Sequence, residues 1–155
     1  MLQDPGTPLG RVLFLTAALV LTPFVMAPGA ASAAAAEPRS EASAEILAAL
    51  LSHADLQGYF HRDSQPERFP LQIIDAARAG LTAPDPAKTL VPAVLPGSAA
   101  AADPRRARLF IDGFRLDAEA AEVTFRFPAE GLSGSAALTP LGGAWQVRQL
   151  RLTEE

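Results

Sequence analysis

The sequence predicts an α+β domain in which one or two N-terminal helices pack on a bent antiparallel β-meander. Apolar residues recur at helical spacing after residue 43, and polar and apolar residues alternate strictly over residues 122–127. Turn-forming residues separate the last segments of the chain, as they do between the strands of a meander. Helices first and strands afterwards indicate helices gathered on one face of an antiparallel sheet.

A leader is expected ahead of this domain. Arg11 is followed by an apolar run over residues 12–25, and Ala31 and Ala33 place small side chains at the −3 and −1 positions of a cleavage site. This order is typical of a secretory signal peptide. The predicted divisions are a signal peptide cleaved near Ala33, a flexible leader and a single α+β domain, at residues 1–33, 34–42 and 43–155.

The expected destination is the periplasm or the cell exterior. The apolar run has 14 residues, whereas a membrane-spanning helix needs about 20, so we expect no permanent membrane anchor. The chain contains no cysteine, so its stability must come from packing and no thiolate can serve as nucleophile or metal ligand. Twelve arginines against one lysine are typical of a GC-rich bacterial genome.

The first helix is predicted between Ser43 and about Gly58. Ser43 is a residue type that caps helices, and Ile46, Leu47 and Leu50 follow at the spacing of an apolar stripe. The stripe supplies the face that packs on the sheet.

A second helix is predicted to begin at Pro70. Proline is favoured in the first turn of a helix, Leu71 and Ile74 fit an apolar stripe, and Gly80 fits the end. A strand over residues 71–74 is the alternative.

The segment 82–104 is predicted to form a Pro/Ala-rich loop. Each proline removes a hydrogen-bond donor from any ladder, and the prolines lie at positions 84, 86, 92, 96 and 104. Regular structure is therefore limited to a short extended piece near residues 89–95. The segment is either a long surface loop or a covering segment with an edge strand.

The last third of the chain is predicted to form the meander. The apolar phase changes at Gly113, which predicts a glycine bulge in preference to a two-residue hairpin at Asp112-Gly113, and again near Arg148, which predicts a second bend or bulge. Trp145 is expected to be buried against the helices. The predicted strands are 108–116, 122–127, 133–139 and 145–153, and the predicted turns are 117–120, 128–131 and 140–143.

This pattern resembles the nuclear-transport-factor-2-like superfamily, whose cone-shaped α+β fold is similar to the cystatin-like fold. The segments that carry the resemblance are Ala121-Glu122-Val123-Thr124-Phe125, Glu130-Gly131, Gly134, Leu138 and Gly142-Gly143-Ala144-Trp145-Gln146-Val147. The proline-rich segment 82–104 departs from the usual pattern, where a helix and strand would be expected. The resemblance implies a fold that hosts isomerases, dehydratases and many non-enzymatic binding or accessory domains.

The acid–base candidates lie between residues 53 and 63. In the isomerase and dehydratase branches of the resembled superfamily, tyrosine, aspartate or histidine transfers protons inside the cone. Tyr59 is the single tyrosine, and with His53, Asp55 or Asp63 it can form such a set. The alternative is that Tyr59 and Phe60 only pack at the helix end.

The metal candidates are the only histidines, His53 and His61, each followed two residues later by an aspartate. Imidazoles and carboxylates are ligands for zinc and other divalent ions. However, eight residues of continuous helix separate the two imidazoles by roughly 80°. A polar helix end and a solvated loop are therefore the favoured interpretation, and we expect no cofactor.

Arginines recur along the predicted strands, at positions 115, 126, 148 and 151, after a basic cluster at 105–108. Together they can attract an acidic partner or an anionic glycan. The favoured alternative is that they pair across the sheet with Glu119, Glu122, Glu154 and Glu155. The formal net charge of −4 argues against a general nucleic-acid binder, which needs a basic face.

The sequence therefore favours an exported, non-enzymatic domain that binds a partner protein or a small ligand through the sheet face or the mouth of the cone. The alternative is a small isomerase- or dehydratase-like enzyme that uses Tyr59 with an aspartate or histidine. The partner and the oligomeric state stay open.

Overall fold

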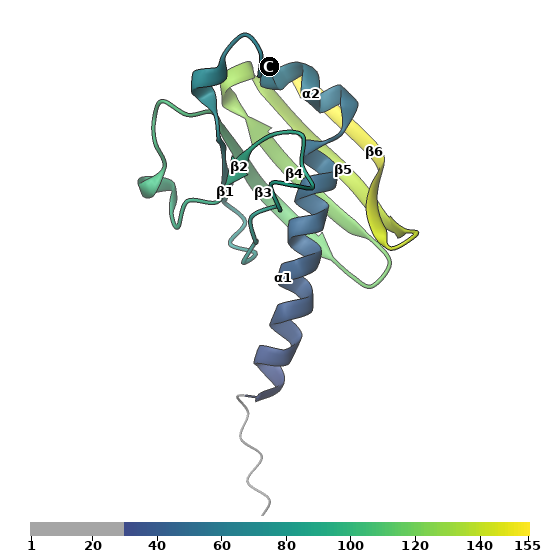
Figure 1. Cartoon of the computed structure of the whole chain (residues 1–155). Helices are drawn as coiled ribbons and strands as arrows, with labels where there is room; N and C mark the ends of the chain where they lie inside the picture. Colours follow the sequence, from purple (N-terminus) through teal and green to yellow (C-terminus); the bar gives the residue numbers. More distant parts are fainter. Residues whose placement is uncertain (1–29) are drawn as a thin grey trace, which may run out of the picture.

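The computed structural model describes residues 30–155, with side chains from Arg39 onward except that of Ala99. It contains two α-helices and six strands (Figure 1). Their bounds are α1 Ala30–Leu51, α2 Ala54–Phe60, β1 Leu71–Asp75, β2 Ala93–Val94, β3 Arg108–Leu116, β4 Ala121–Phe127, β5 Leu132–Leu141 and β6 Ala144–Glu154. Single turns of 3-10 helix lie at η1 Pro66–Arg68, η2 Ala99–Ala101 and η3 Pro128–Glu130.

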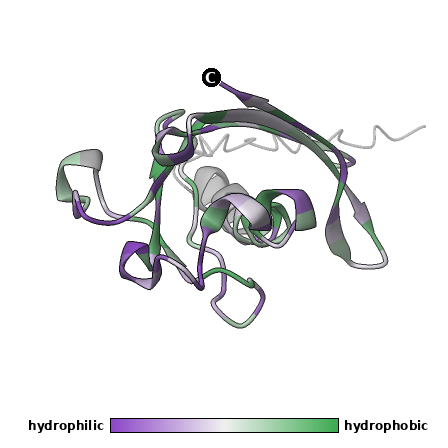
Figure 2. Cartoon of the chain, turned by 90° about the horizontal axis from the view of Figure 1, so that it is seen from above, coloured by the Kyte–Doolittle hydropathy of each residue, from purple (hydrophilic) through white to green (hydrophobic). Residues whose placement is uncertain are grey.

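The six strands form one open sheet in the order β2-β1-β3-β4-β5-β6. Strands β3 to β6 are an antiparallel meander, while β1 runs parallel to both of its neighbours, β2 and β3. The sheet curves, and α1 and α2 lie within the curve (Figure 2). The predicted fold class is confirmed, since two N-terminal helices pack on a mostly antiparallel sheet.

Helix α1 supplies the apolar stripe that the sequence predicts. Ile46, Leu47, Leu50 and Leu51 are all completely buried. The helix nevertheless begins at Ala30, well before Ser43, so residues 34–42, predicted as a flexible leader, are helical. Within the described part of the chain, no helix is long and apolar enough to cross a membrane.

Ser43 lies inside α1 and not at its start. Its hydroxyl donates to the carbonyl of Ser40 at 2.8 Å and accepts from the amide of Thr82 at 3.1 Å. A serine in a helix interior commonly bonds a carbonyl of the preceding turn. Ser43 therefore holds the Pro/Ala-rich segment against α1, while the predicted capping role is wrong.

The helix predicted to reach Gly58 is broken at Ser52 and His53. Helix α1 ends at Leu51, and α2 begins at Ala54 after His53 adopts an extended backbone with φ −67° and ψ 131°. The break changes the direction of the helix axis, and α2 places Leu56 and Phe60 in the core. The apolar stripe thus continues into two helices instead of one.

The helix predicted from Pro70 is wrong, and the alternative strand is correct. Strand β1 pairs with β2 on one side and β3 on the other, and Leu71 to Ile74 are all buried. On one face, the buried Gln72 donates its side-chain amide to the carbonyl of Asp103. A strand that is covered on both faces shows no alternation in its sequence, so its apolar run fits a helix equally well.

The segment 82–104 is a covering segment with an edge strand, which is one of the two predicted alternatives. The edge strand is β2, within the extended piece predicted at residues 89–95. Val91 is completely buried and Ala93 is 7% exposed. The segment therefore contributes side chains to the core, despite its prolines.

Both predicted bulges are present in the meander. The β3–β4 register shifts between Ile111 and Gly113, and the β5–β6 register shifts between Ala137 and Leu138, opposite Arg148. At the first bulge, a Cβ on Gly113 would lie 2.5 Å from Thr124 Oγ1, so this close approach requires glycine. Each bulge inserts one extra residue, so that the apolar side chains before and after it point to the same face of the sheet, toward the helices.

Trp145 is less buried than predicted. It lies on β6, at the edge of the sheet, is only partly buried, and lines a surface pocket with Ala48 and Ala49 of α1. The centre of the core is formed by other aromatic rings. Phe60 and Phe127 meet edge to face with ring centroids 5.7 Å apart, and both are 1% exposed.

Candidate functional site

His53 acts as the N-terminal cap of α2. Its Nδ1 accepts a hydrogen bond from the amide of Asp55 at 3.3 Å, which satisfies one of the free donors at the helix start. The Asp55 side chain is 72% exposed, and its Oδ2 lies 3.9 Å from the same imidazole nitrogen. Both residues therefore have a local structural role at the helix end.

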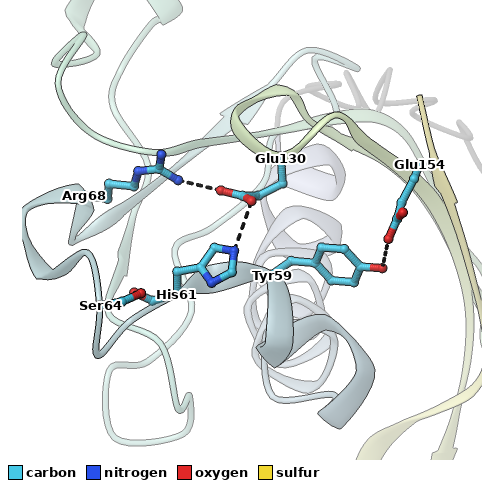
Figure 3. A network of polar contacts seen from close by, with 6 residues as sticks. All are labelled: Tyr59, His61, Ser64, Arg68, Glu130 and Glu154. Carbon is cyan, nitrogen blue, oxygen red and sulfur yellow. Dashed lines mark hydrogen bonds and ion pairs between the residues drawn. The ribbon is translucent and has the colours of Figure 1, made fainter.

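Tyr59 is tied to the end of the last strand. Its hydroxyl donates to Glu154 Oε1 at 2.7 Å (Figure 3). This hydrogen bond raises the pKa of Tyr59 above its ordinary value of 10, with smaller contributions from burial and from the charges of Glu154 and Asp55. The contact fastens α2 to β6 across 95 positions of sequence.

His61 faces a different carboxylate. Its Nε2 lies 3.1 Å from Glu130 Oε2, and Arg68 Nη1 donates to the other oxygen, Oε1, at 2.5 Å. The Glu130 side chain is only 17% exposed. The network in Figure 3 therefore joins the connection after α2 to the 3-10 turn η3, and a single carboxylate receives two donors.

The sequence-predicted acid–base set does not converge. Tyr59 and His61 point to different glutamates in Figure 3, and His53 caps a helix. Asp63 is exposed and lines an open surface hollow with His61. In the described part of the chain, no group of three or more His, Asp or Glu side chains could hold a metal ion.

Glu130, Glu154 and Arg68 were not among the sequence candidates for this network. Glu130 stands within the resembled Glu130-Gly131 turn, where Gly131 takes a left-handed conformation with φ 58°. The Glu130 carboxylate points to His61 and Arg68, which lie between α2 and β1 (Figure 3). The separations of 62 and 69 positions to Arg68 and His61 leave no local signal for the pairing.

The outer face of the sheet is the second polar region, and no described helix lies over it (Figure 2). On β4, exposed Glu122, Thr124 and Arg126 alternate with buried residues, so these three point outward. Register pairing places Thr124 beside Ser135, and Ser135 beside Arg151. A hollow of about 340 Å³ lies over these strands.

The arginines of this face differ in how they are paired. Arg126 donates to both oxygens of Asp112, at 2.7 and 2.8 Å, and these bonds raise the pKa of its guanidinium. Arg115 pairs with Glu122 at 3.4 Å, as the sequence predicts. Arg108 and Arg151 have no ion pair among the described residues, so no described carboxylate neutralises either charge. With its amide oriented to satisfy both of its groups, Gln149 accepts from Arg151 Nε at 3.2 Å and Nη2 at 3.1 Å.

Other predicted carboxylate partners are used elsewhere. Glu154 receives Tyr59, and Arg148 donates to the hydroxyl of Thr139 at 2.9 Å. Among the described ion pairs of these arginines, only that of Arg115 is with one of the predicted glutamates, Glu122.

The chain matches no family model, no curated protein and no solved structure.

Proposed function

We propose that the chain is an exported, non-enzymatic binding domain that uses the outer face of its sheet to hold an acidic partner. The observation that carries this proposal is the outer face of β3 to β6, which no described helix covers and where two arginines lack carboxylate partners. On the opposite face, α1 lies within the curve of the sheet (Figure 2). A helix in that position fits the resemblance to the nuclear-transport-factor-2-like superfamily and leaves the outer face for contact.

Charge supports the choice of partner. The whole chain has a formal net charge of −4, yet the outward strand positions hold Arg108, Arg115, Arg126 and Arg151 against Asp112 and Glu122. Glu155 adds a carboxylate near Arg126. Arg115 and Arg126 are paired, so the positive charge that no described carboxylate neutralises is that of Arg108 and Arg151. Such charge speeds the encounter with a partner of the opposite sign.

Hydroxyl groups support a polar contact on the same face. Thr124, Ser133, Ser135 and Thr153 surround the hollow beside Arg151. Hydroxyls both donate and accept hydrogen bonds, so they can satisfy the backbone or side chains of an acidic segment whose charge meets Arg151. The acid–base alternative receives no such support, because the Tyr59 hydroxyl is bonded to Glu154 and the His53 imidazole caps α2.

The experiment is a titration of ¹⁵N-labelled protein with poly-L-glutamate, with poly-L-lysine as the polymer of opposite charge. We expect poly-L-glutamate to shift the amides of residues 133–135 and 151, and the shifts to weaken as salt rises. Arg151→Gln should weaken binding several-fold. Arg62→Gln is the matched control, because Arg62 is an exposed arginine that bonds the Leu90 carbonyl away from this face.

Two results would contradict the proposal. One is the absence of any shift on the outer face with poly-L-glutamate at low salt. The other is equal weakening by Arg151→Gln and Arg62→Gln, which would mean that only net charge matters.

A further inference from the structure

A cleft of about 320 Å³ opens at one corner of the outer face, where β3 begins. Its wall is built from the segment that leads into β3, from the strand itself and from η3. Its lining includes Pro104, Arg106, Arg108, Phe110 and Pro128. They combine two guanidinium groups with three apolar rings, a mixture that the network of Figure 3 lacks.

The base of the cleft is fixed by main-chain hydrogen bonds. The amide of Ala107 donates to the carbonyl of Arg68 at 3.0 Å, and the carbonyl of Ala107 accepts from Gln72 at 2.9 Å. The amide of Arg106 donates to Asp103 at 3.1 Å. Arg106 and Arg108 therefore project from a backbone that is already ordered, which lowers the entropy cost of binding.

The positive charge of the cleft is only partly neutralised. Arg108 has no ion pair among the described residues. The closest carboxylate to Arg106 is Asp103, at 3.8 Å, and Arg105 approaches that same carboxylate at 3.4 Å. At 3.8 Å Asp103 lies beyond hydrogen-bond distance of Arg106 and it does not line the cleft, so a ligand carboxylate would meet two guanidinium groups there.

The ring of Phe110 contributes to the apolar part of the cleft. The guanidinium carbon of Arg126 lies 5.3 Å from the centre of the Phe110 ring, within the range of a cation–π contact. Asp112 holds that guanidinium in place through two hydrogen bonds. The pyrrolidine rings of Pro104 and Pro128 complete an apolar surface beside the charges.

We propose that this cleft receives a segment of the partner in which an acidic residue adjoins an aromatic one. The carboxylate would pair with Arg106 and Arg108, and the aromatic ring would pack on Phe110 and the prolines. This inference rests on the proposed function and specifies the chemistry of its partner. A peptide fits better than a free small acid, because the cleft presents a charged part and an apolar part together, and Phe110 at its edge pairs with Arg126 on the outer face.

The probe is the peptide acetyl-Gly-Phe-Glu-Gly-amide, titrated into ¹⁵N-labelled full-length protein. We expect shifts at the amides of residues 106–110 and 129. Replacing the peptide's glutamate by glutamine, or its phenylalanine by alanine, should each weaken binding about tenfold, which is the size of one good charged or aromatic contact. The protein variant Arg108→Gln should weaken binding of the parent peptide by a similar factor.

Arg105→Gln is the matched control variant. Arg105 belongs to the same basic cluster and its side chain is 89% exposed, but it does not line the cleft. We expect this variant to bind the peptide like the wild type. Equal weakening by Arg105→Gln and Arg108→Gln would overturn the cleft as the site.

The titrations separate this inference from the proposed function. If poly-L-glutamate shifts residues 133–135 and 151 while the peptide leaves residues 106–110 unchanged, the cleft inference fails and the outer face stands. If neither probe shifts any outward residue of the sheet, both fail. Equal affinity for the parent peptide and for its phenylalanine-to-alanine variant would show that the cleft recognises only the carboxylate. That result would also overturn the inference.

Discussion

Adding a single methyl group at Gly134 is expected to destabilise the fold. Gly134 lies opposite Phe125 and Leu152 in the sheet. A Cβ at this position would lie 2.6 Å from Phe125 Cζ, 2.8 Å from the Arg151 carbonyl oxygen and 3.0 Å from Leu152 Cδ2. Favourable contacts between heavy atoms lie near 3.5–4.0 Å, so neighbours on both sides must move.

The magnitude follows from two opposing effects. Replacing glycine by alanine reduces the entropy of the unfolded chain, which stabilises by about 0.4–1 kcal/mol where the site has room. Overpacking a filled core costs about 1–3 kcal/mol, and the Arg151 contact is to backbone, which cannot rotate away. We therefore expect Gly134→Ala to lower the free energy of unfolding by about 1–2 kcal/mol.

Urea denaturation followed by far-ultraviolet circular dichroism measures this loss. Gly58→Ala is the control, because a Cβ there would meet no atom within 4 Å and Gly58 lies inside α2. Alanine is favoured over glycine within a helix by about 1 kcal/mol, so this variant should be at least as stable as the wild type.

A double variant isolates the contact with the ring. Phe125→Leu removes the Cζ atom, so Gly134→Ala should cost less in that background than in the wild type, with a coupling of about 0.5–1.5 kcal/mol. If Gly134→Ala unfolds at or above the wild-type urea midpoint, the packing described for β5 against Phe125 is wrong.

Three further outcomes are expected. Absorbance at 295 nm should show that Tyr59, the single tyrosine, ionises above pH 10, because its neutral hydroxyl donates a hydrogen bond to Glu154. Glu154→Gln should lower that pKa, and an unchanged titration curve would refute the contact. The pKa of Asp103 lies below its ordinary value, mainly because its carboxylate accepts a hydrogen bond from the backbone amide of Arg105. Asp103 therefore stabilises the fold above the unfolded pKa of about 3.9. This stabilisation is lost as the pH falls through the lower pKa of the folded state. Asp103→Asn should therefore be less stable than the wild type at pH 7, with the gap in urea midpoint closing near pH 2; a gap that does not depend on pH would contradict this. Mass spectrometry of protein purified from a bacterial periplasm should find residues 1–33 removed, and an intact Met1 would refute cleavage.

The meander could be predicted from sequence because its signals are local. Alternation over residues 122–127 reports directly on a strand with one buried face, and the phase changes at Gly113 and Arg148 report on the bulges. A bulge needs only neighbouring residues to be recognised, since one extra residue inverts the faces of everything after it. These features therefore did not depend on knowing the partner strands.

Strand β1 could not be predicted in this way. Its identity depends on β2 and β3, which pair with it in parallel from distant parts of the chain, and on Gln72 meeting the carbonyl of Asp103. A run of four buried residues carries neither a period of two nor a period of 3.6. Pro70 and Gly80 then suggested helix ends for a helix that does not form.

The polar network around Glu130 was beyond reach for the same reason. The sequence singled out Tyr59, His53, His61, Asp55 and Asp63 by residue type and spacing alone. Which carboxylate each one meets depends on how α2 packs against β6 and η3, a property of the tertiary fold. Local spacing identified residues that have polar roles, but it did not identify their partners.

The bulge opposite Arg148 also affects how the molecule meets its neighbours. Strand β6 forms one edge of the sheet over 11 residues, and a long regular edge invites strands of other molecules to add to it. The extra residue kinks this edge and places a charged side chain there, while the opposite edge, β2, is only two residues long. Short, kinked or charged edges discourage the addition of strands and so oppose aggregation.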